Sequence, residues 1–235
     1  WHGLETNQFG LDEFMNWADK TAIEPMMAVN LGTNGLKEAL DLIEYTNVEA
    51  KSKWAQERVK NGHEKAYDIK VWCLGNEMDG PWQLGHKNAE DYATVAADVA
   101  RGMRQIGENL ELVACGSSNR SMPTFGAWEE TVLEKTYDLV DHISLHTYYE
   151  DLGDTQEFLV ISTDLDYMIN EVCNVADAVK AKIRSEKTIT LSLDEWNVWN
   201  LSKFQAMERP KEWLPAQRVI EDEYTFKDAV VLGNL

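Results

Sequence analysis

The sequence has 235 residues, of which 44% are hydrophobic and 27% charged, so it can bury a sizeable core and does not have a disordered composition. No apolar run approaches the about 18 residues of a transmembrane helix. Its 41 acidic residues against 22 Lys and Arg give a net charge of -19, which repels nucleic-acid phosphates and anionic membranes but not a neutral sugar, so we expect neither nucleic acid nor membrane as a partner.

Short apolar runs alternate with longer helical patterns along the chain. In chain order the pattern predicts helix 11–21, strand 25–30, helix 35–46, strand 69–75, helix 89–107, strand 110–116, helix 129–137, strand 142–149, helix 164–185 and strand 188–196. The helix from Ala89 has the clearest start, because Asn88 is a good N-cap residue and acids follow in the first turn. Strands that alternate with helices predict a parallel sheet covered by helices.

Two architectures fit this alternation. The strand starts are separated by roughly 30 to 47 residues, against about 31 residues per unit in a (β/α)8 barrel before loop insertions. A doubly wound open sheet is the alternative, but no strand is followed by the G-x-G-x-x-G of a dinucleotide site and no phosphate-binding P-loop is present. We therefore expect an α/β fold, a (β/α)8 TIM barrel that is incomplete in this chain, with five strands of eight.

The cysteines indicate the redox compartment, and the chain ends indicate that the sequence belongs to a longer protein. Cys73, Cys115 and Cys173 are odd in number, widely spaced and set among apolar residues, which predicts buried thiols in a reducing, cytoplasmic compartment and no disulfide framework or zinc site. The chain opens at Trp1 without a Met or signal peptide and stops at Leu235 just after an apolar run, so we expect a piece of a longer protein.

In a barrel, catalytic groups stand where the strands end and the following loops begin. Those positions hold Asn30, Asn76, Glu77, Ser117, Ser118, Asn119, His146, Tyr148, Asp194 and Glu195. Glu77 and Glu195 each follow an apolar strand directly, where a carboxylate is costly unless it is paired or solvated. A single such Glu is more often a helix-start acid or a salt-bridged loop residue, but two, each close to tryptophans, favour a functional pair.

Paired carboxyls and aromatic faces are what glycoside hydrolysis requires. One carboxyl protonates the leaving-group oxygen, and the other, ionised, attacks the sugar or activates water. Indole rings offer flat apolar surface to the C–H face of a sugar. Four tryptophans lie close in sequence to the two Glu: Trp72, Trp82, Trp196 and Trp199.

The motifs resemble glycoside hydrolase family 51, the α-L-arabinofuranosidases. They are ETNQFGLDEF (5–14), EPMMAVNLGT (24–33), WCLGNEMDGPWQLGHK (72–87), CGSSNRSMPTF (115–125), ISLHTYY (143–149), LSLDEWNVW (191–199) and DEYTFKDAV (222–230). They occur in order along essentially the whole chain, and GNEMDGPWQ and DEWNVW are long and unusual. The resemblance implies a barrel accompanied by a β-sandwich, and a retaining enzyme without a cofactor that removes terminal α-L-arabinofuranosyl residues from arabinan- or arabinoxylan-type oligosaccharides.

The resemblance also implies roles for particular residues. Glu77 matches the general acid/base at the end of the fourth barrel strand, and Glu195 matches the nucleophile at the end of the seventh. Asn76 matches the residue that hydrogen-bonds the sugar 2-hydroxyl, and Tyr148 resembles the tyrosine beside the nucleophile. The remaining substrate-binding candidates are Trp1 and His146, although a packed strand histidine is an equally good interpretation of His146.

Parts of the family pattern lie outside this sequence. The chain corresponds to about strands three to seven, so residues 1–235 would form a partial barrel domain. The first two strands would precede Trp1, and the eighth strand and the β-sandwich, absent here, would follow Leu235. The sugar pocket would then be incomplete, and we expect the isolated chain to have little activity. The family resemblance implies a homo-oligomer for the full-length protein.

Other functions remain as alternatives. His142 and His146 would be about 13 Å apart on a strand, too far for one ion, and no H-E-x-x-H is present, so we expect no metal. The G-x-S-x-G of a serine hydrolase is also missing. An inactive or carbohydrate-binding fragment is a further possibility, as is another retaining glycosidase such as a β-glycanase.

The resemblance makes the arrangement of the two carboxyls testable. We expect the carboxyls of Glu77 and Glu195 to lie about 5–5.5 Å apart, the separation of retaining enzymes. We also expect the pKa of Glu77 to be the raised one, since the acid must carry a proton.

Overall fold

The computed structural model describes residues 3–49, 51–107, 109–202, 211–215 and 224–235. A five-stranded parallel sheet lies at the centre, with the strand order β2-β3-β4-β5-β6. The strands are β2 (Met26–Ala28), β3 (Val71–Cys73), β4 (Glu111–Ala114), β5 (His142–Tyr149) and β6 (Thr190–Val198). All five predicted strands are therefore confirmed, with shorter bounds for the first three.

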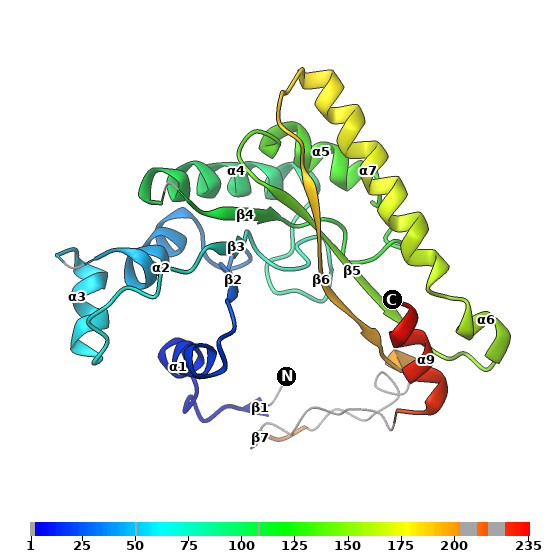
Figure 1. The fold of residues 1–235 in the computed structure, drawn as a ribbon, viewed down its shortest axis with the longest axis horizontal. Helices are drawn as coiled ribbons and strands as arrows, with labels where there is room; N and C mark the ends of the chain where they lie inside the picture. The colour runs from blue at the N-terminus through cyan, green and yellow to red at the C-terminus, as the bar shows by residue number, and fades with distance from the viewer. Residues whose placement is uncertain (1–2, 50, 108, 203–210, 216–223) are drawn as a thin grey trace.

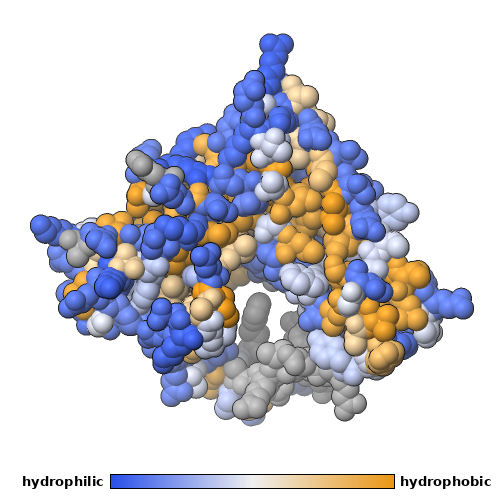
Figure 2. Space-filling model, in the orientation of Figure 1, coloured by the Kyte–Doolittle hydropathy of each residue, from blue (hydrophilic) through white to orange (hydrophobic). Residues whose placement is uncertain are grey.

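The strand order separates the two architectures left open by the sequence. A doubly wound sheet reverses its strand order at a switch point, whereas here each strand pairs with the next one along the chain. Figure 1 shows the sheet curling between β2 and β6, with α1 on the open side of the curl. Figure 2 shows that the molecule is hollowed on this concave side. The fold is thus mixed α/β with a half-barrel sheet, consistent with part of a TIM barrel.

Helices connect the successive strands. They are α1 (Leu11–Thr21) before β2, α2 (Leu36–Asn47) before β3, α4 (Ala89–Ile106) before β4, α5 (Ala127–Thr136) before β5 and α7 (Thr163–Ile183) before β6. Helix α4 packs between α2 and α5, and α5 packs in turn against α7. In Figure 1 the helices α2, α4, α5 and α7 follow one another around the convex side of the sheet, as in the outer layer of a barrel.

Several short elements have no counterpart among the predictions. They are α3 (Lys53–Lys60), α6 (Thr155–Leu159), α9 (Phe226–Asn234) and a two-stranded parallel sheet of β1 (Gly3–Leu4) and β7 (Leu214–Pro215). Helix α9 packs on α6 and β6, where Val231 joins Phe158 and Val198 in a small apolar cluster. In the part of the chain described, no helix is long and apolar enough to cross a membrane.

A single buried cation ties α3 to α2. The Arg58 side chain is fully buried, and its guanidinium donates hydrogen bonds to the backbone carbonyls of Tyr45, Val48 and His63. The Val48 oxygen accepts from both Nη1 and Nη2 at 3.1 Å. Orphan carbonyls at the end of α2 are therefore satisfied by a side chain of the next helix.

Aromatic residues join the sheet to its helices. The rings of Tyr92 on α4 and Trp128 on α5 stack with their centroids 5.3 Å apart. The Tyr92 hydroxyl donates to the Leu74 carbonyl at 2.8 Å and accepts from the Cys115 amide at 2.7 Å. This one hydroxyl fixes the loops that leave β3 and β4 relative to each other.

The prediction of three buried thiols is wrong for one of them. Cys115 is buried and Cys73 half-buried, but Cys173 is exposed. Cys173 follows the buried Val172 on α7, and neighbouring residues on a helix point about 100° apart, so it leaves the apolar face.

The loops that follow β2 and β3 touch backbone to backbone. A Cβ on Gly85 would collide with the Gly32 carbonyl, and a Cβ on Gly32 would collide with the Leu84 carbonyl. Gly85 also has a φ of +81°, which side chains disfavour. The Lys87 ammonium donates to the carbonyl oxygens of Gly32 and Gly85, at 3.4 and 3.2 Å. Glycine at both positions therefore makes this close approach possible.

Candidate active site

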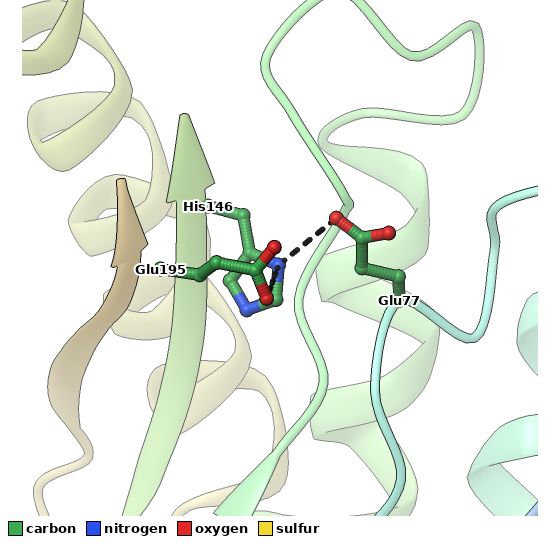
Figure 3. A group of neighbouring side chains, drawn as sticks. All are labelled: Glu77, His146 and Glu195. Carbon is green, nitrogen blue, oxygen red and sulfur yellow. Dashed lines mark hydrogen bonds and ion pairs between the residues drawn. The ribbon is translucent and has the colours of Figure 1, made fainter. Parts of the chain in front are cut away.

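Three side chains meet at the carboxyl edge of the sheet. Glu77 lies in the loop after β3, His146 lies on β5 and Glu195 lies on β6. Figure 3 shows the carboxylates of Glu77 and Glu195 pointing toward the same nitrogen of the His146 ring, Nδ1. One carboxylate oxygen of each Glu and a ring nitrogen of His146 all lie within 4.8 Å of one another. The sheet therefore brings together two candidates that are far apart in the sequence.

The loop that carries Glu77 has an unusual backbone. Gly75 has a φ of 99° and Glu77 a φ of 44°, and the second value is uncommon for a residue with a side chain. The loop is anchored by Asp79, whose buried carboxylate accepts hydrogen bonds from the amide and the hydroxyl of Ser118 after β4. Such strain persists where the surroundings hold it in place, and it is common at active sites.

The Glu77 carboxylate has a donor on each oxygen. Trp82 Nε1 donates to Oε2 at 2.6 Å, and His146 Nδ1 lies 3.2 Å from Oε1. The Trp82 indole can take this position because residue 80 is glycine: a Cβ there would lie 2.5 Å from the indole ring. Half of Trp82 remains exposed, so its ring faces the space in front of Glu77 as well as fixing the carboxylate.

A bulge in β6 directs two consecutive acids toward His146. Leu145 of β5 pairs with Leu193 and His146 pairs with Glu195, so Asp194 is an extra residue in β6. Consecutive strand residues normally point to opposite faces, and a bulge changes that alternation. As a result, Asp194 Oδ1 lies 3.0 Å from His146 Nε2, while Glu195 Oε2 lies 3.6 Å from Nδ1 of the same ring.

The His146 ring is buried among carboxylates. Only 5% of the residue is exposed, and burial alone lowers the pKa of an imidazole. That effect is outweighed by the nearby carboxylates of Asp194, Glu77 and Glu195, which together raise the pKa of His146 to about 9. The surrounding carboxylates therefore favour the imidazolium form of His146 at neutral pH.

Glu195 is held by a neighbour on β5. The Tyr148 hydroxyl donates to Glu195 Oε1 at 2.7 Å, and burial together with this carboxylate raises the pKa of Tyr148 above its ordinary range. The Tyr148 ring contacts Trp199 edge-on, with centroids 5.3 Å apart. The predicted proximity of Tyr148 to Glu195 is thus present.

The expectation of a raised pKa for Glu77 is wrong in this structure. Burial does raise the pKa of Glu77, but the hydrogen bonds from His146 and Trp82 and the positive charge of His146 outweigh it and leave the pKa below its ordinary value. The lowered pKa of Glu77 and the raised pKa of His146 both favour the proton on the imidazole, 3.2 Å from the carboxylate that was expected to carry it.

The same three side chains are of types that can bind a metal ion. Each contributes one ligand-type atom to the cluster of Glu77, His146 and Glu195. Because the pKa of His146 is raised to about 9, a metal ion would have to displace a proton from the ring in order to bind. The carboxylates, moreover, already accept from Trp82 and Tyr148. The absence of a metal from the reaction stays a prediction.

The other predicted residues fall outside this cluster. Asn76 is exposed next to Glu77, and Trp1 lies outside the described residues. Of the tryptophans noted in the sequence, Trp72 is fully buried in the core, whereas Trp196 is about half exposed. Sequence reasoning placed Asp194 at a strand end without giving it a role, because strand periodicity alone sends its side chain away from His146.

A curled parallel sheet with two opposed glutamates at its carboxyl edge is typical of barrel-type glycoside hydrolases. The family profile described as "Alpha-L-arabinofuranosidase 1 domain" matches residues 1–159. The chain belongs to this family, the α-L-arabinofuranosidases of glycoside hydrolase family 51, as its motifs suggested.

Relatives and solved structures agree with this assignment. An exo-alpha-(1->6)-L-arabinofuranosidase of Bifidobacterium longum is 51% identical over 100% of this chain and 47% of its own length. An intracellular exo-alpha-(1->5)-L-arabinofuranosidase of Bacillus subtilis is likewise 51% identical, over 100% of this chain and 47% of that protein. The solved structure of AbfB, a family 51 enzyme from Bifidobacterium longum, superposes with a TM-score of 0.94 at 45% identity, covering 99% of this chain and 48% of that one.

A more distant structure shows the same fold. The arabinose complex of the Thermotoga maritima α-L-arabinofuranosidase superposes with a TM-score of 0.79 at 33% identity, covering 97% of this chain and 44% of that one. The chain thus spans about half the length of the curated relatives it matches.

Proposed function

We propose that this chain forms part of the catalytic barrel of a retaining, exo-acting α-L-arabinofuranosidase in which Glu195 is the nucleophile and Glu77 the general acid/base. The observation that supports it most directly is that one oxygen of Glu77 and one oxygen of Glu195 lie within 4.8 Å of each other. Retaining glycosidases have carboxyls about 5–5.5 Å apart, whereas inverting enzymes need about 6.5–9.5 Å to admit a water molecule between them.

In the first step, Glu195 attacks the anomeric carbon while Glu77 protonates the departing oxygen. The Tyr148 hydrogen bond to Oε1 orients the Glu195 carboxylate and leaves Oε2 available for attack. Glu77 is ionised in the free site, so it must gain a proton, and His146 Nδ1 at 3.2 Å is placed to supply it. The products of this step are a glycosyl ester of Glu195 and the released alcohol.

In the second step, water hydrolyses the ester. Glu77, now deprotonated, accepts a proton from the water that attacks the anomeric carbon, and Glu195 leaves as a carboxylate. Two displacements at one carbon return the original configuration. The exposed ring of Trp82, which donates to Glu77, offers apolar surface for a sugar ring beside the reacting bond.

From the relatives we further propose the substrate class and the cellular location of the protein. Names that specify (1->5) or (1->6) linkages support terminal arabinofuranosyl residues of arabinan- or arabinoxylan-type oligosaccharides as the substrate class. The exposed Asn76 would bind the sugar 2-hydroxyl. Several relatives are named intracellular, which supports a cytoplasmic protein, and we propose a homo-oligomer at natural length. Residues 1–235 then form part of the barrel domain, with the β-sandwich outside this sequence.

The two glutamates can be distinguished by kinetics. With an aryl α-L-arabinofuranoside whose leaving group needs no proton, Glu195→Ala should abolish turnover, because no ester can form. Glu77→Ala should still form the ester and then stall, and added azide should restore turnover and yield an arabinosyl azide of retained configuration.

Equal loss in both variants, without rescue by azide, contradicts these role assignments. The exposed Asp138→Asn, a charge change outside the site, serves as the control and should leave turnover unchanged. Absence of arabinofuranoside hydrolysis by the wild-type protein at its natural length contradicts the proposed activity itself.

A further inference from the structure

Asp194 is an acid that the two-glutamate mechanism does not use. It is the extra residue of the β6 bulge, and its side chain is only 13% exposed. One oxygen faces His146 Nε2 at 3.0 Å, and the other accepts from the Ser192 hydroxyl at 2.9 Å, with the Cys73 thiol 3.9 Å away. A buried carboxylate in this position is costly unless a cation compensates it.

We propose that Asp194 is a positioning residue that keeps a proton in the active site: it holds the His146 ring as a cation whose Nδ1 faces both Glu77 and Glu195. This inference rests on the proposed function, because it assigns Asp194 a part in supplying the proton that Glu77 delivers.

The charges around the ring show why a third acid matters. The titratable groups facing His146 are Glu77 from the loop after β3, and Asp194 and Glu195 from β6. Glu77 and Glu195 both approach Nδ1, while Asp194 alone faces Nε2. Among the described residues Asp194 Oδ1 accepts no hydrogen bond, so Asp194 acts on the ring through its negative charge, 3.0 Å from Nε2. The proton that can reach Glu77 is the one on Nδ1, which lies 3.2 Å from Oε1.

That mobile proton can then be transferred without any co-reactant. The Nδ1–H bond breaks, its electron pair stays in the ring, and an O–H bond forms on Glu77 Oε1. The imidazolium becomes neutral and the carboxylate becomes a carboxyl, so the total charge is unchanged. His146 and Glu77 therefore share one titrating proton, and the pH at which the pair loses it is a property of the pair.

Asp194 raises the pH at which this proton is lost. A negative charge 3.0 Å from Nε2 favours the cation, and it contributes to the pKa of about 9 for His146. The active form needs one proton on the pair, so the upper pH limit of kcat/KM follows this loss. Without the Asp194 charge, the limit should move to lower pH.

The test is Asp194→Asn in the protein at its natural length, since Asn keeps the size of Asp but not its charge. For the variant we expect the upper limit of the kcat/KM profile to fall by about one pH unit or more, with a smaller change near pH 6. In ¹³C-histidine NMR spectra, the His146 signal, assigned by its loss in His146→Gln, should titrate at a correspondingly lower pH. Asp138→Asn, an exposed acid, is the matched control and should shift neither value.

A purely structural role predicts something different. It lowers kcat/KM by the same factor at every pH and leaves the His146 titration in place, and that result overturns the proposal. Should Asp194→Asn fail to fold, the wild-type spectrum still decides: a His146 that titrates near its ordinary pKa of about 6.5 rejects the inference. Loss of the proposed glycosidase activity would be distinct, because the NMR titration does not depend on any substrate.

Discussion

The side chain missing at position 80 decides where the Trp82 indole lies. In Gly80→Ala the new Cβ would lie 2.5 Å from the indole, so the ring must move and the 2.6 Å hydrogen bond to Glu77 must lengthen or break. Glu77 then loses a donor that orients its carboxylate. For an arabino-oligosaccharide we expect kcat/KM to fall about 10-fold, which corresponds to the loss of one charged hydrogen bond. For an activated aryl arabinofuranoside we expect a smaller fall, because only poor leaving groups need the acid.

Steady-state kinetics with the two substrates measure this difference. Gly35→Ala is the matched comparison, since that glycine also lies outside a strand and a Cβ there meets no atom within 4 Å. Neither Gly35 nor Gly80 has a positive φ, so neither substitution adds backbone strain, and Gly35→Ala should leave activity unchanged. An equal loss for both substrates in Gly80→Ala contradicts an effect through the acid.

The sequence alone identifies some of the active-site side chains and misses others. Glu77 and Glu195 could be found because each follows an apolar strand, and the sheet does bring them together. His146 was ambiguous, because strand periodicity does not reveal three acids around one ring. The approach of Asp194 to His146 could not be predicted, because it depends on the bulge, which is a property of the pairing between β5 and β6. The pKa of Glu77 depends on His146 in turn, so it could not be predicted from Glu77 alone.

The pair α2 and α3 depends on one buried arginine. Arg58→Leu removes the hydrogen bonds from three backbone carbonyls and leaves them buried without a donor. We expect the free energy of unfolding to fall by about 3 kcal/mol, the upper range for losing a charged donor to buried acceptors.

Chemical denaturation of the natural-length protein measures this loss. Arg101→Leu on α4 is the matched control, since 56% of that side chain is exposed and its ion pair with Asp98 lies on the surface. Activity of Arg58→Leu at low temperature should be retained, because the residue is remote from the strand ends. A change of less than about 0.5 kcal/mol would show that solvent replaces the lost donors.

Helices and strands were predicted to different degrees. The bounds of α1 and β5 agree with the periodicity, since both present regular apolar faces. Helix α3 was missed because its sequence, KWAQERVK, is short and mostly polar, and its buried contact is made by an arginine. Helix α9 contains the apolar run 229–232, but its packing on α6 and β6 is tertiary and leaves no local signal.

The central sheet has two outer strands. Among the described residues, β2 pairs only with β3 and β6 only with β5. Parallel sheets are normally covered on both faces and closed in a barrel, so the concave side lacks part of its walls. We expect the 235-residue chain produced alone to hydrolyse an aryl arabinofuranoside at least about 100-fold more slowly than the natural-length protein, because small misplacements already cost that much.

The turnover of the purified 235-residue chain and of the natural-length protein can be compared in one assay, and their oligomeric states by light scattering. The short chain should also self-associate through its sheet edges or its uncovered apolar surface. A soluble monomer with turnover comparable to the longer protein contradicts this expectation.

The backbone contact between the loops after β2 and β3 has a consequence for engineering substrate preference. Gly32 and Gly85 leave no room for an inserted side chain, and Lys87 bonds to both carbonyl oxygens. The loop carrying Glu77 cannot be exchanged for one from another glycosidase while its neighbour stays unchanged. Recombination between enzymes should therefore succeed only when both loops come from the same parent, and libraries that shuffle them separately should contain mostly inactive chimeras.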